Sequence, residues 1–95
     1  MVGKIWREFL FRKGDNRPEE RNALIIFNEN GTFKWGTDEG TYTIQGNHVT
    51  IRKRTNPGNP YTFSFVEHNI GHLTLTQNVI GGDYVYYCSY VPKNL

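Results

Sequence analysis

The residues in this sequence that could carry chemistry are few and scattered. The titratable candidates for a catalytic site are nine Asp and Glu residues, three histidines and one cysteine, namely His48, His68, His72 and Cys88. Catalysis requires such groups within hydrogen-bonding reach of one another, and none of them belongs to a recognised catalytic motif. We therefore predict that the protein is not an enzyme and has no catalytic residues.

His68 and His72 are the histidine pair whose spacing matters for metal binding. Residues four apart share one face of a helix, but these two flank Asn69-Ile70-Gly71, which predicts a turn. Cys88 lies in an aromatic run without a neighbouring histidine, which is typical of a buried thiol that fills a gap in a core. We therefore expect no metal site and no other cofactor.

Arg52, Lys53 and Arg54 form the densest positive run of the chain. In a strand, Arg52 and Arg54 would lie on one side of the sheet and Lys53 on the other. Two guanidinium groups on one face suit a bidentate clamp for a phosphate or carboxylate group. The alternative is a charged strand that discourages aggregation of the sheet.

The first predicted strand, residues 4–12, brings a further cationic candidate, Arg7. One face of this strand carries Ile5, Arg7, Phe9 and Phe11, and the other carries Trp6, Glu8, Leu10 and Arg12. Either choice of inward face places a charged side chain inside the protein or at its rim, where that charge needs a partner.

Aromatic side chains are the other resource for binding. The chain has six Phe, six Tyr and two Trp residues, so large rings must supply much of the buried area. Five of them could line a cavity and stack on a planar ligand: Trp35, Tyr42, Tyr61, Tyr86 and Tyr90. The same rings could instead fill a barrel that is too narrow for a ligand. Together with Arg52 and Arg54 they suit a nucleotide, whose base stacks on a ring while its phosphate meets the guanidinium groups.

The elements that must position these side chains are short strands joined by turns. From residue 23 onward, β-branched and aromatic runs alternate with Asn- and Gly-containing turns, a spacing typical of consecutive hairpins. The clearest hairpin joins residues 24–27 and 32–35 through Asn30-Gly31, which supplies the positive backbone angles of a tight turn. Residues 84–91 are apolar on both faces, which fits a covered strand, a strand that closes a barrel, or one that meets a partner.

Residues 13–22 interrupt this pattern and contain Pro18-Glu19-Glu20, which is typical of a short helix of one or two turns. We count about eight strands in sequential hairpin order. The sequence therefore predicts an all-β fold, a small antiparallel up-and-down β-barrel that residues 1–95 form as a single domain. Closure of the barrel would also remove exposed strand edges.

Charge and hydropathy restrict the partners. The net charge of +2 is too slight to argue for nucleic acid, and no run approaches the roughly 18 apolar residues of a membrane span. The first residues carry charges where a signal peptide would have its apolar core, and the single cysteine allows no internal disulfide. We expect a cytoplasmic protein that does not bind membranes. Nucleic-acid binding by a small barrel is a weaker hypothesis, because the charge is nearly balanced, although strand aromatic residues and the run Arg52-Lys53-Arg54 suit it.

Four short motifs follow one another along most of the chain: Gly3 with Trp6, Phe-x-x-x-Gly-Thr-Phe at residues 27–33, Gly-Thr-Tyr-x-Ile at 40–44, and Leu-Thr-Leu-Thr at 73–76. In this order they resemble the small bacterial lipocalin-like domains. The chain departs from the lipocalin pattern in having two residues between Gly3 and Trp6, and no arginine in the last strand to cover the tryptophan. The resemblance implies a binding barrel but no particular ligand.

These observations predict a non-catalytic protein that takes up or sequesters a small anionic, partly aromatic ligand such as a nucleotide-derived signal. Small phage-type proteins that absorb host signalling nucleotides would be a precedent, although nothing in the sequence shows a viral origin. The candidate ligand-binding residues are Arg7, Arg52, Arg54, Trp35, Tyr42, Tyr61, Tyr86 and Tyr90. The alternative is a protein–protein interaction module or inhibitor, or a homodimer, that uses Tyr86, Tyr87 and Tyr90 of the last strand as anchors.

Overall fold

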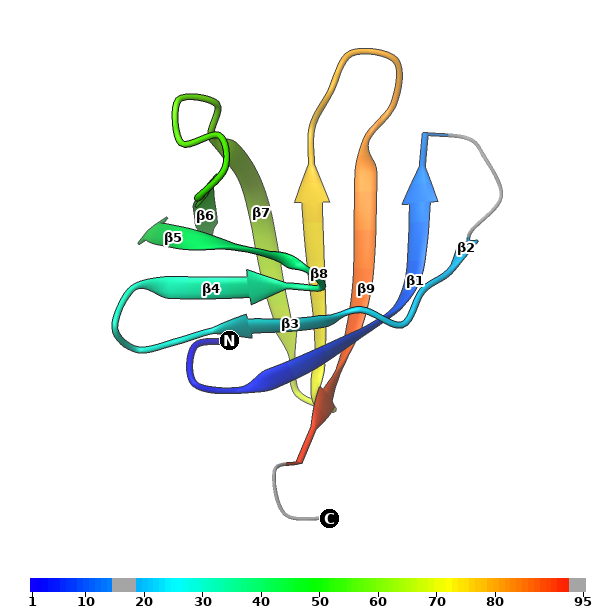
Figure 1. Ribbon diagram of the computed structural model, residues 1–95. Coiled ribbons are helices and arrows are strands. Elements are labelled where there is room, and N and C mark those ends of the chain that lie inside the picture. Colours follow the sequence, from blue (N-terminus) through cyan, green and yellow to red (C-terminus); the bar gives the residue numbers. More distant parts are fainter. Residues whose placement is uncertain (15–18, 93–95) are drawn as a thin grey trace.

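A computed structural model describes residues 1–14 and 19–92 of the chain. These residues form nine β-strands, β1 (Ile5–Lys13), β2 (Glu19–Glu20), β3 (Leu24–Phe27), β4 (Thr32–Trp35), β5 (Asp38–Gln45), β6 (His48–Lys53), β7 (Tyr61–His68), β8 (His72–Gln77) and β9 (Tyr84–Val91) (Figure 1). All neighbouring strands are antiparallel and follow the order β1-β3-β4-β5-β6-β7-β8-β9. The predicted all-β, up-and-down arrangement is confirmed.

The barrel is closed by the pairing of the first strand with the last. β1 and β9 pair over their whole length, from Ile5 opposite Val91 to Lys13 opposite Tyr84. Eight strands therefore form the ring, and β2 is an additional short strand beside the far end of β1. β9 has a hydrogen-bonded neighbour on each edge, so its apolar pattern belongs to the strand that closes the barrel.

The prediction of a short helix in residues 13–22 is wrong for the part of this segment that the structure describes. Glu19 and Glu20 are extended and pair with Phe11 and Leu10 of β1. This segment therefore forms a short strand beside β1. The rest of Pro18-Glu19-Glu20, with residues 15–17, lies outside the described residues. No helix occurs in residues 1–14 and 19–92, and hence none that could span a membrane.

A β-bulge decides which side chains of β1 point inward. Trp6 and Glu8 are buried, as in one of the two predicted faces. One extra residue, Phe9, then stands between Glu8 opposite Cys88 and Leu10 opposite Tyr87. This insertion reverses the alternation, so that Phe11 and not Leu10 shares the face of Tyr86. Neither predicted face is therefore inward along the whole strand.

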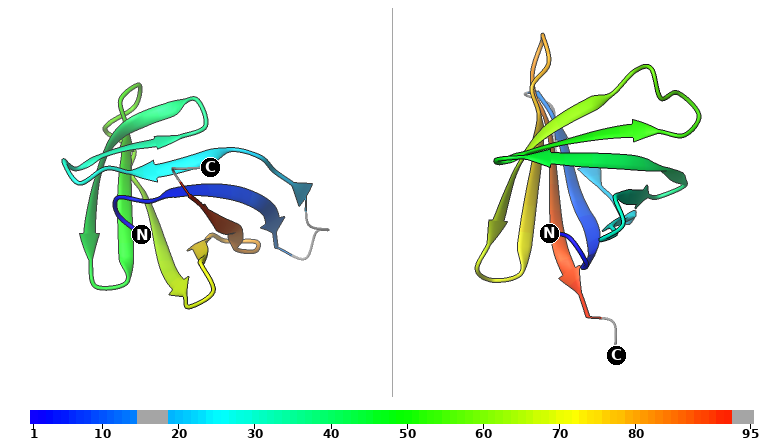
Figure 2. Two further views of the ribbon diagram at one scale, coloured as in Figure 1. Left: turned by 90° about the horizontal axis from the view of Figure 1, so that it is seen from below. Right: turned by 90° about the vertical axis from the view of Figure 1, so that its left-hand side faces the viewer.

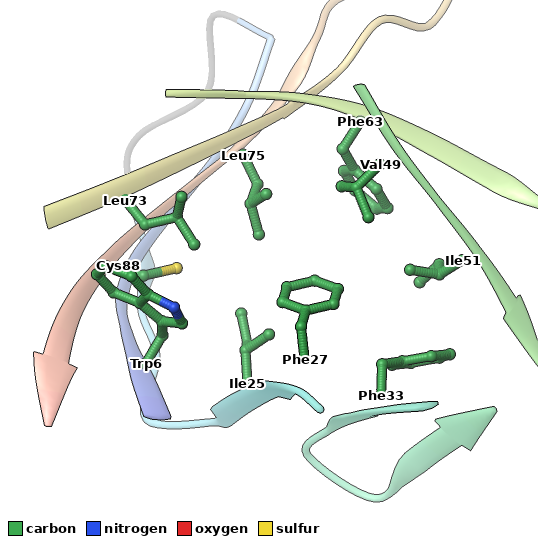
Figure 3. Packing of buried hydrophobic residues seen from close by; sticks show 10 residues of the cluster. All are labelled: Trp6, Ile25, Phe27, Phe33, Val49, Ile51, Phe63, Leu73, Leu75 and Cys88. Carbon is green, nitrogen blue, oxygen red and sulfur yellow. The ribbon is translucent and has the colours of Figure 1, made fainter. Parts of the chain in front are cut away.

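The hydrophobic core fills the interior of the barrel. In Figure 1, β3 and β4 run across β7 and β8 at a steep angle, and Figure 2 gives two further views of the same barrel. Ten buried hydrophobic side chains meet between them (Figure 3), namely Trp6, Ile25, Phe27, Phe33, Val49, Ile51, Phe63, Leu73, Leu75 and Cys88. They occupy alternate positions of their strands, as period-two patterns require.

Candidate functional site

A cavity of about 300 Å³ lies at one end of the barrel, beside the turn between β4 and β5. The ends of β4 and β6 and the beginnings of β5 and β7 meet there, because antiparallel neighbours bring alternate strand ends together. Its apolar wall contains Phe33, Trp35, Ile51, Tyr61, Phe63 and Tyr86, and its charged lining residues are Glu8, Arg21, Asp38 and Lys53. The cavity thus combines large rings with both signs of charge.

The aromatic wall is a packed cluster contributed by three strands. The ring of Trp35 on β4 lies 5.3 Å from that of Phe63 on β7 and 4.9 Å from that of Tyr86 on β9, measured between centroids. Phe63 and Tyr86 are 5.8 Å apart and meet edge to face. Mutual contacts of this kind hold each ring in place and leave a rigid surface against which a planar molecule can pack.

Glu8 is the buried charged group of the cavity, with a residue exposure of 1%. Its Oε1 accepts a hydrogen bond of 2.9 Å from Trp35 Nε1. Its Oε2 is buried and has no hydrogen-bond partner among the described residues. The nearest cation is Arg21, whose Nε lies 3.9 Å from Oε2, beyond hydrogen-bond distance.

The environment of Glu8 opposes its ionisation. Burial raises the pKa of the Glu8 carboxyl above its ordinary value, while the hydrogen bond from Trp35 and the charge of Arg21 act against that rise. The same carboxyl helps to raise the pKa of Tyr86 to about 12, after the larger effect of burial.

Two cations stand at the mouth of the cavity. Lys53 Nζ is 3.2 Å from Asp38 Oδ2 and 4.9 Å from the centroid of the Tyr61 ring. Arg21 is 45% exposed and lies over the ring of Phe11, at 4.5 Å from its centroid. Both are accessible enough to meet an anionic group that enters from solvent.

Three of the predicted binding residues are brought together here, namely Trp35, Tyr61 and Tyr86. The other two aromatic candidates lie outside the cavity. Tyr42 packs edge-on against Phe27 and donates a hydrogen bond of 2.6 Å to the carbonyl oxygen of Asn28. Tyr90 is 42% exposed and contacts Trp6.

The structure does not bring the three predicted arginines to the cavity. Arg52 donates a hydrogen bond of 3.1 Å to the carbonyl oxygen of Pro57. Arg54 is 76% exposed and forms an ion pair of 2.6 Å with Glu39. Arg7 donates to Asn22 Oδ1 at 2.6 Å. Each therefore has a partner on the outside of the barrel, and they do not converge on a common point.

Four charged cavity residues were missed as binding candidates: Glu8, Arg21, Asp38 and Lys53. The signal for Lys53 is present in the sequence, because alternation places it on the same face as the apolar residues Val49 and Ile51. Arg21 has no such signal, since it lies in an irregular segment between β2 and β3.

The remaining chemical candidates lie apart from this site. His68 and His72 are paired on β7 and β8, and His68 Nε2 is 3.1 Å from Thr74 Oγ1. Within residues 1–14 and 19–92, no group of three or more His, Cys, Asp and Glu side chains could hold a metal ion. Cys88 is fully buried, and this burial raises the pKa of its thiol to about 12.

No family model matches the sequence, and no curated protein does. Among solved structures, the chain is similar to an uncharacterized protein from Bacteroides eggerthii DSM 20697, with a TM-score of 0.68 and 15% sequence identity. The match covers 94% of this chain and 98% of that one. At this identity the likeness concerns the fold alone: both chains form a small antiparallel β-barrel.

Proposed function

We propose that this protein is a non-catalytic, lipocalin-like binding protein whose cavity takes up a small, partly aromatic anion such as a nucleotide-derived signal. The observation that carries the proposal is the combination in one cavity of a rigid aromatic wall with two cations at the mouth. Rings supply stacking area for a base or similar plane, and Lys53 and Arg21 supply charge for a phosphate or carboxylate.

The volume of the cavity limits what it can hold. Ligand pockets usually measure roughly 300–1,000 Å³, and this one, at about 300 Å³, belongs at the small end. One ring system fits such a space, with its charged substituent left at the mouth. A cavity of this size favours a compact ligand over a long acyl chain.

Uptake without turnover would make the protein a stoichiometric trap. A trap lowers the free concentration of a signal only when protein exceeds both the ligand and the dissociation constant. Native mass spectrometry of the protein purified from cells, compared with the denatured mass, tests this directly. We expect an additional mass in the native spectrum that disappears on denaturation.

Titration with nucleoside 5′-monophosphates, followed by tryptophan fluorescence, tests the assignment of the cavity. Lys53→Met removes the charge at the mouth and keeps a side chain of similar length, so we expect affinity to fall about tenfold. Arg52→Met is the matched control on the outer face of the same strand, and its affinity should equal that of the wild type. Equal losses in the two variants, or no binding by the wild type, would argue against the proposal.

An interaction module is a second candidate, supported by exposed apolar side chains on the outside of the barrel. Phe9 is 40% exposed and Val66 54%, whereas Tyr90 lies on the face of the buried Trp6, at the end of the barrel. Tyr87, which has the opposite orientation to the cavity residue Tyr86, belongs to the same outer surface. If this surface joins two copies, the molecular mass in solution will rise with concentration, and Tyr87→Ser will reduce that rise.

A further inference from the structure

We propose that Glu8 selects the ligand by accepting hydrogen bonds from two adjacent donors on one edge of a planar ring, the ring N–H and exocyclic NH₂ of a guanine-type base. This inference rests on the proposed function, because it names the ligand class of the same cavity. It goes beyond that function by assigning specificity to a carboxyl group and not to the cations at the mouth.

The free acceptor on Glu8 carries the argument. A carboxylate offers two oxygens with about four lone-pair positions, and Trp35 Nε1 occupies one of them. Glu8 is one of the residues that line the cavity, and its buried Oε2 has no hydrogen-bond partner among the described residues, although leaving a buried charged acceptor unpaired is costly. A ligand in the cavity that brings donors would remove this cost, and a ligand that brings only acceptors would increase it.

Arg21 does not donate the missing hydrogen bond to Glu8 Oε2 in the structure. Its Nε is 3.9 Å from Glu8 Oε2, while its guanidinium lies on the ring of Phe11 and within 3.7 Å of a Glu19 carboxylate oxygen. Arg21 therefore contributes charge near Glu8 without supplying the missing hydrogen bond. Its partial exposure leaves it available to the anionic part of a ligand.

The rings around the Glu8 carboxyl group favour a planar ligand with two hydrogen-bond donors on one edge. Trp35 and Tyr86, which stand in contact with each other, bring ring surfaces beside the carboxyl group, and Trp35 also fixes its orientation through the hydrogen bond. Two parallel N–H donors match the two oxygens of a carboxylate, as in bidentate arginine pairs. A guanine-type edge has two such donors side by side, whereas the corresponding edge of adenine sets an acceptor nitrogen beside its amino group.

The test compares GMP, IMP and AMP, which share the ribose and phosphate and differ in the donors of the base. IMP keeps the ring N–H and lacks the amino group, and AMP lacks the ring N–H. We expect calorimetric titration to give the tightest binding for GMP, with IMP weaker by about tenfold and AMP weaker still. Because these probes differ only in the ligand, the comparison does not depend on any variant folding.

The variant Glu8→Gln provides a second test, in which the protein and not the ligand is changed. Gln keeps the shape and one acceptor oxygen, and its amide NH₂ opposes the donors of guanine, so the preference for GMP over AMP should fall to within about twofold. Circular dichroism establishes that this variant is folded, and Lys53→Met serves as the control that weakens all three nucleotides alike.

The possible results separate the two proposals. Equal binding of GMP and AMP by the wild type, with both weakened in Lys53→Met, would overturn the role of Glu8 and leave the proposed function intact. A GMP preference that survives in folded Glu8→Gln would overturn it as well. If none of the three nucleotides binds, the inference fails together with the nucleotide part of the proposed function.

Discussion

The buried carboxyl of Glu8 couples the stability of the protein to pH. Burial raises its pKa above the ordinary value of 4.5, so the folded state binds the proton more tightly than the unfolded state. The stabilising contribution of the protonated form is present below pH 4.5 and is lost as the pH rises through the raised pKa. We predict that Glu8→Gln is more stable than the wild type at pH 7, by roughly 1 kcal/mol, and that the difference disappears near pH 4.

Urea unfolding of both proteins across this pH range measures the effect. Glu67→Gln is the control of opposite sign, because hydrogen bonds from Lys4 and from the amino terminus lower the pKa of Glu67. The contribution of Glu67 is present above pH 4.5 and is lost as the pH falls through its lowered pKa. A constant difference between Glu8→Gln and the wild type at every pH would contradict the coupling.

The thiol of Cys88 provides a second prediction at the scale of the residue. Burial, with a smaller effect of the Glu8 charge, raises its pKa to about 12, so the thiolate is scarce at neutral pH. We predict that a thiol reagent such as Ellman's reagent leaves the native protein unmodified over an hour at pH 7.5. The same reagent should modify one thiol per chain in urea; rapid modification without urea would show that the strand around Cys88 opens easily.

Among the elements, β5 depends on a close approach of its backbone to β6. Gly40 lies opposite Lys53, and a Cβ at this position would collide with the carbonyl oxygen of Arg52. Gly40→Ala must therefore push β5 away from β6, and we predict a loss of about 1–3 kcal/mol in the free energy of unfolding. Gly58→Ala is the matched control, because a Cβ there meets nothing within 4 Å. Similar urea midpoints for the two variants would contradict this explanation.

For the whole molecule, barrel closure joins segments from the two ends of the sequence. The pairing of β1 with β9 sets Ile5 beside Val91, so the ring forms only when nearly the whole chain is in place. Such non-local topologies fold in milliseconds to seconds and unfold cooperatively. We predict one urea transition, with the same midpoint by far-ultraviolet circular dichroism and by fluorescence.

Two tryptophans allow this cooperativity to be examined region by region. Trp6 is fully buried beside Met1, whose carbonyl oxygen accepts its indole hydrogen bond, whereas Trp35 lines the cavity. In Trp35→Phe the fluorescence reports Trp6 alone, and its midpoint should equal the one from circular dichroism of the same variant. The wild-type fluorescence contains the signals of both tryptophans. If it changes at a lower urea concentration than the circular dichroism of the wild type, while the two probes agree in Trp35→Phe, the cavity end opens separately.

Much of the barrel was predictable from the sequence because its signals are local. Alternation identified the buried faces of β6 and β8, and Asn30-Gly31 identified the turn between β3 and β4. Of this pair only Gly31 has the predicted positive φ, 86°, and Asn30 does not. These features depend on residues within a few positions of one another. When about eight strands follow one another through such turns, a closed barrel is the arrangement in which every strand edge is paired.

The candidate site was only partly predictable, because its members meet through the tertiary structure. Trp35, Tyr61 and Tyr86 were expected to bind, but alternation could not tell which end of the barrel each ring reaches, and Tyr42 lies elsewhere. The inward side chain of the basic run is Lys53 and not its arginine neighbours.

What the sequence determined by itself was the class of fold, since strand periodicity and turn chemistry act over short distances. What only the tertiary structure decided was the cavity. The bulge at Phe9, which switches the inward face of β1, arises from its register with β9, and the contact of Glu8 with Trp35 spans 27 residues. Register and closure depend on the packing of the complete ring, and no local pattern specifies them.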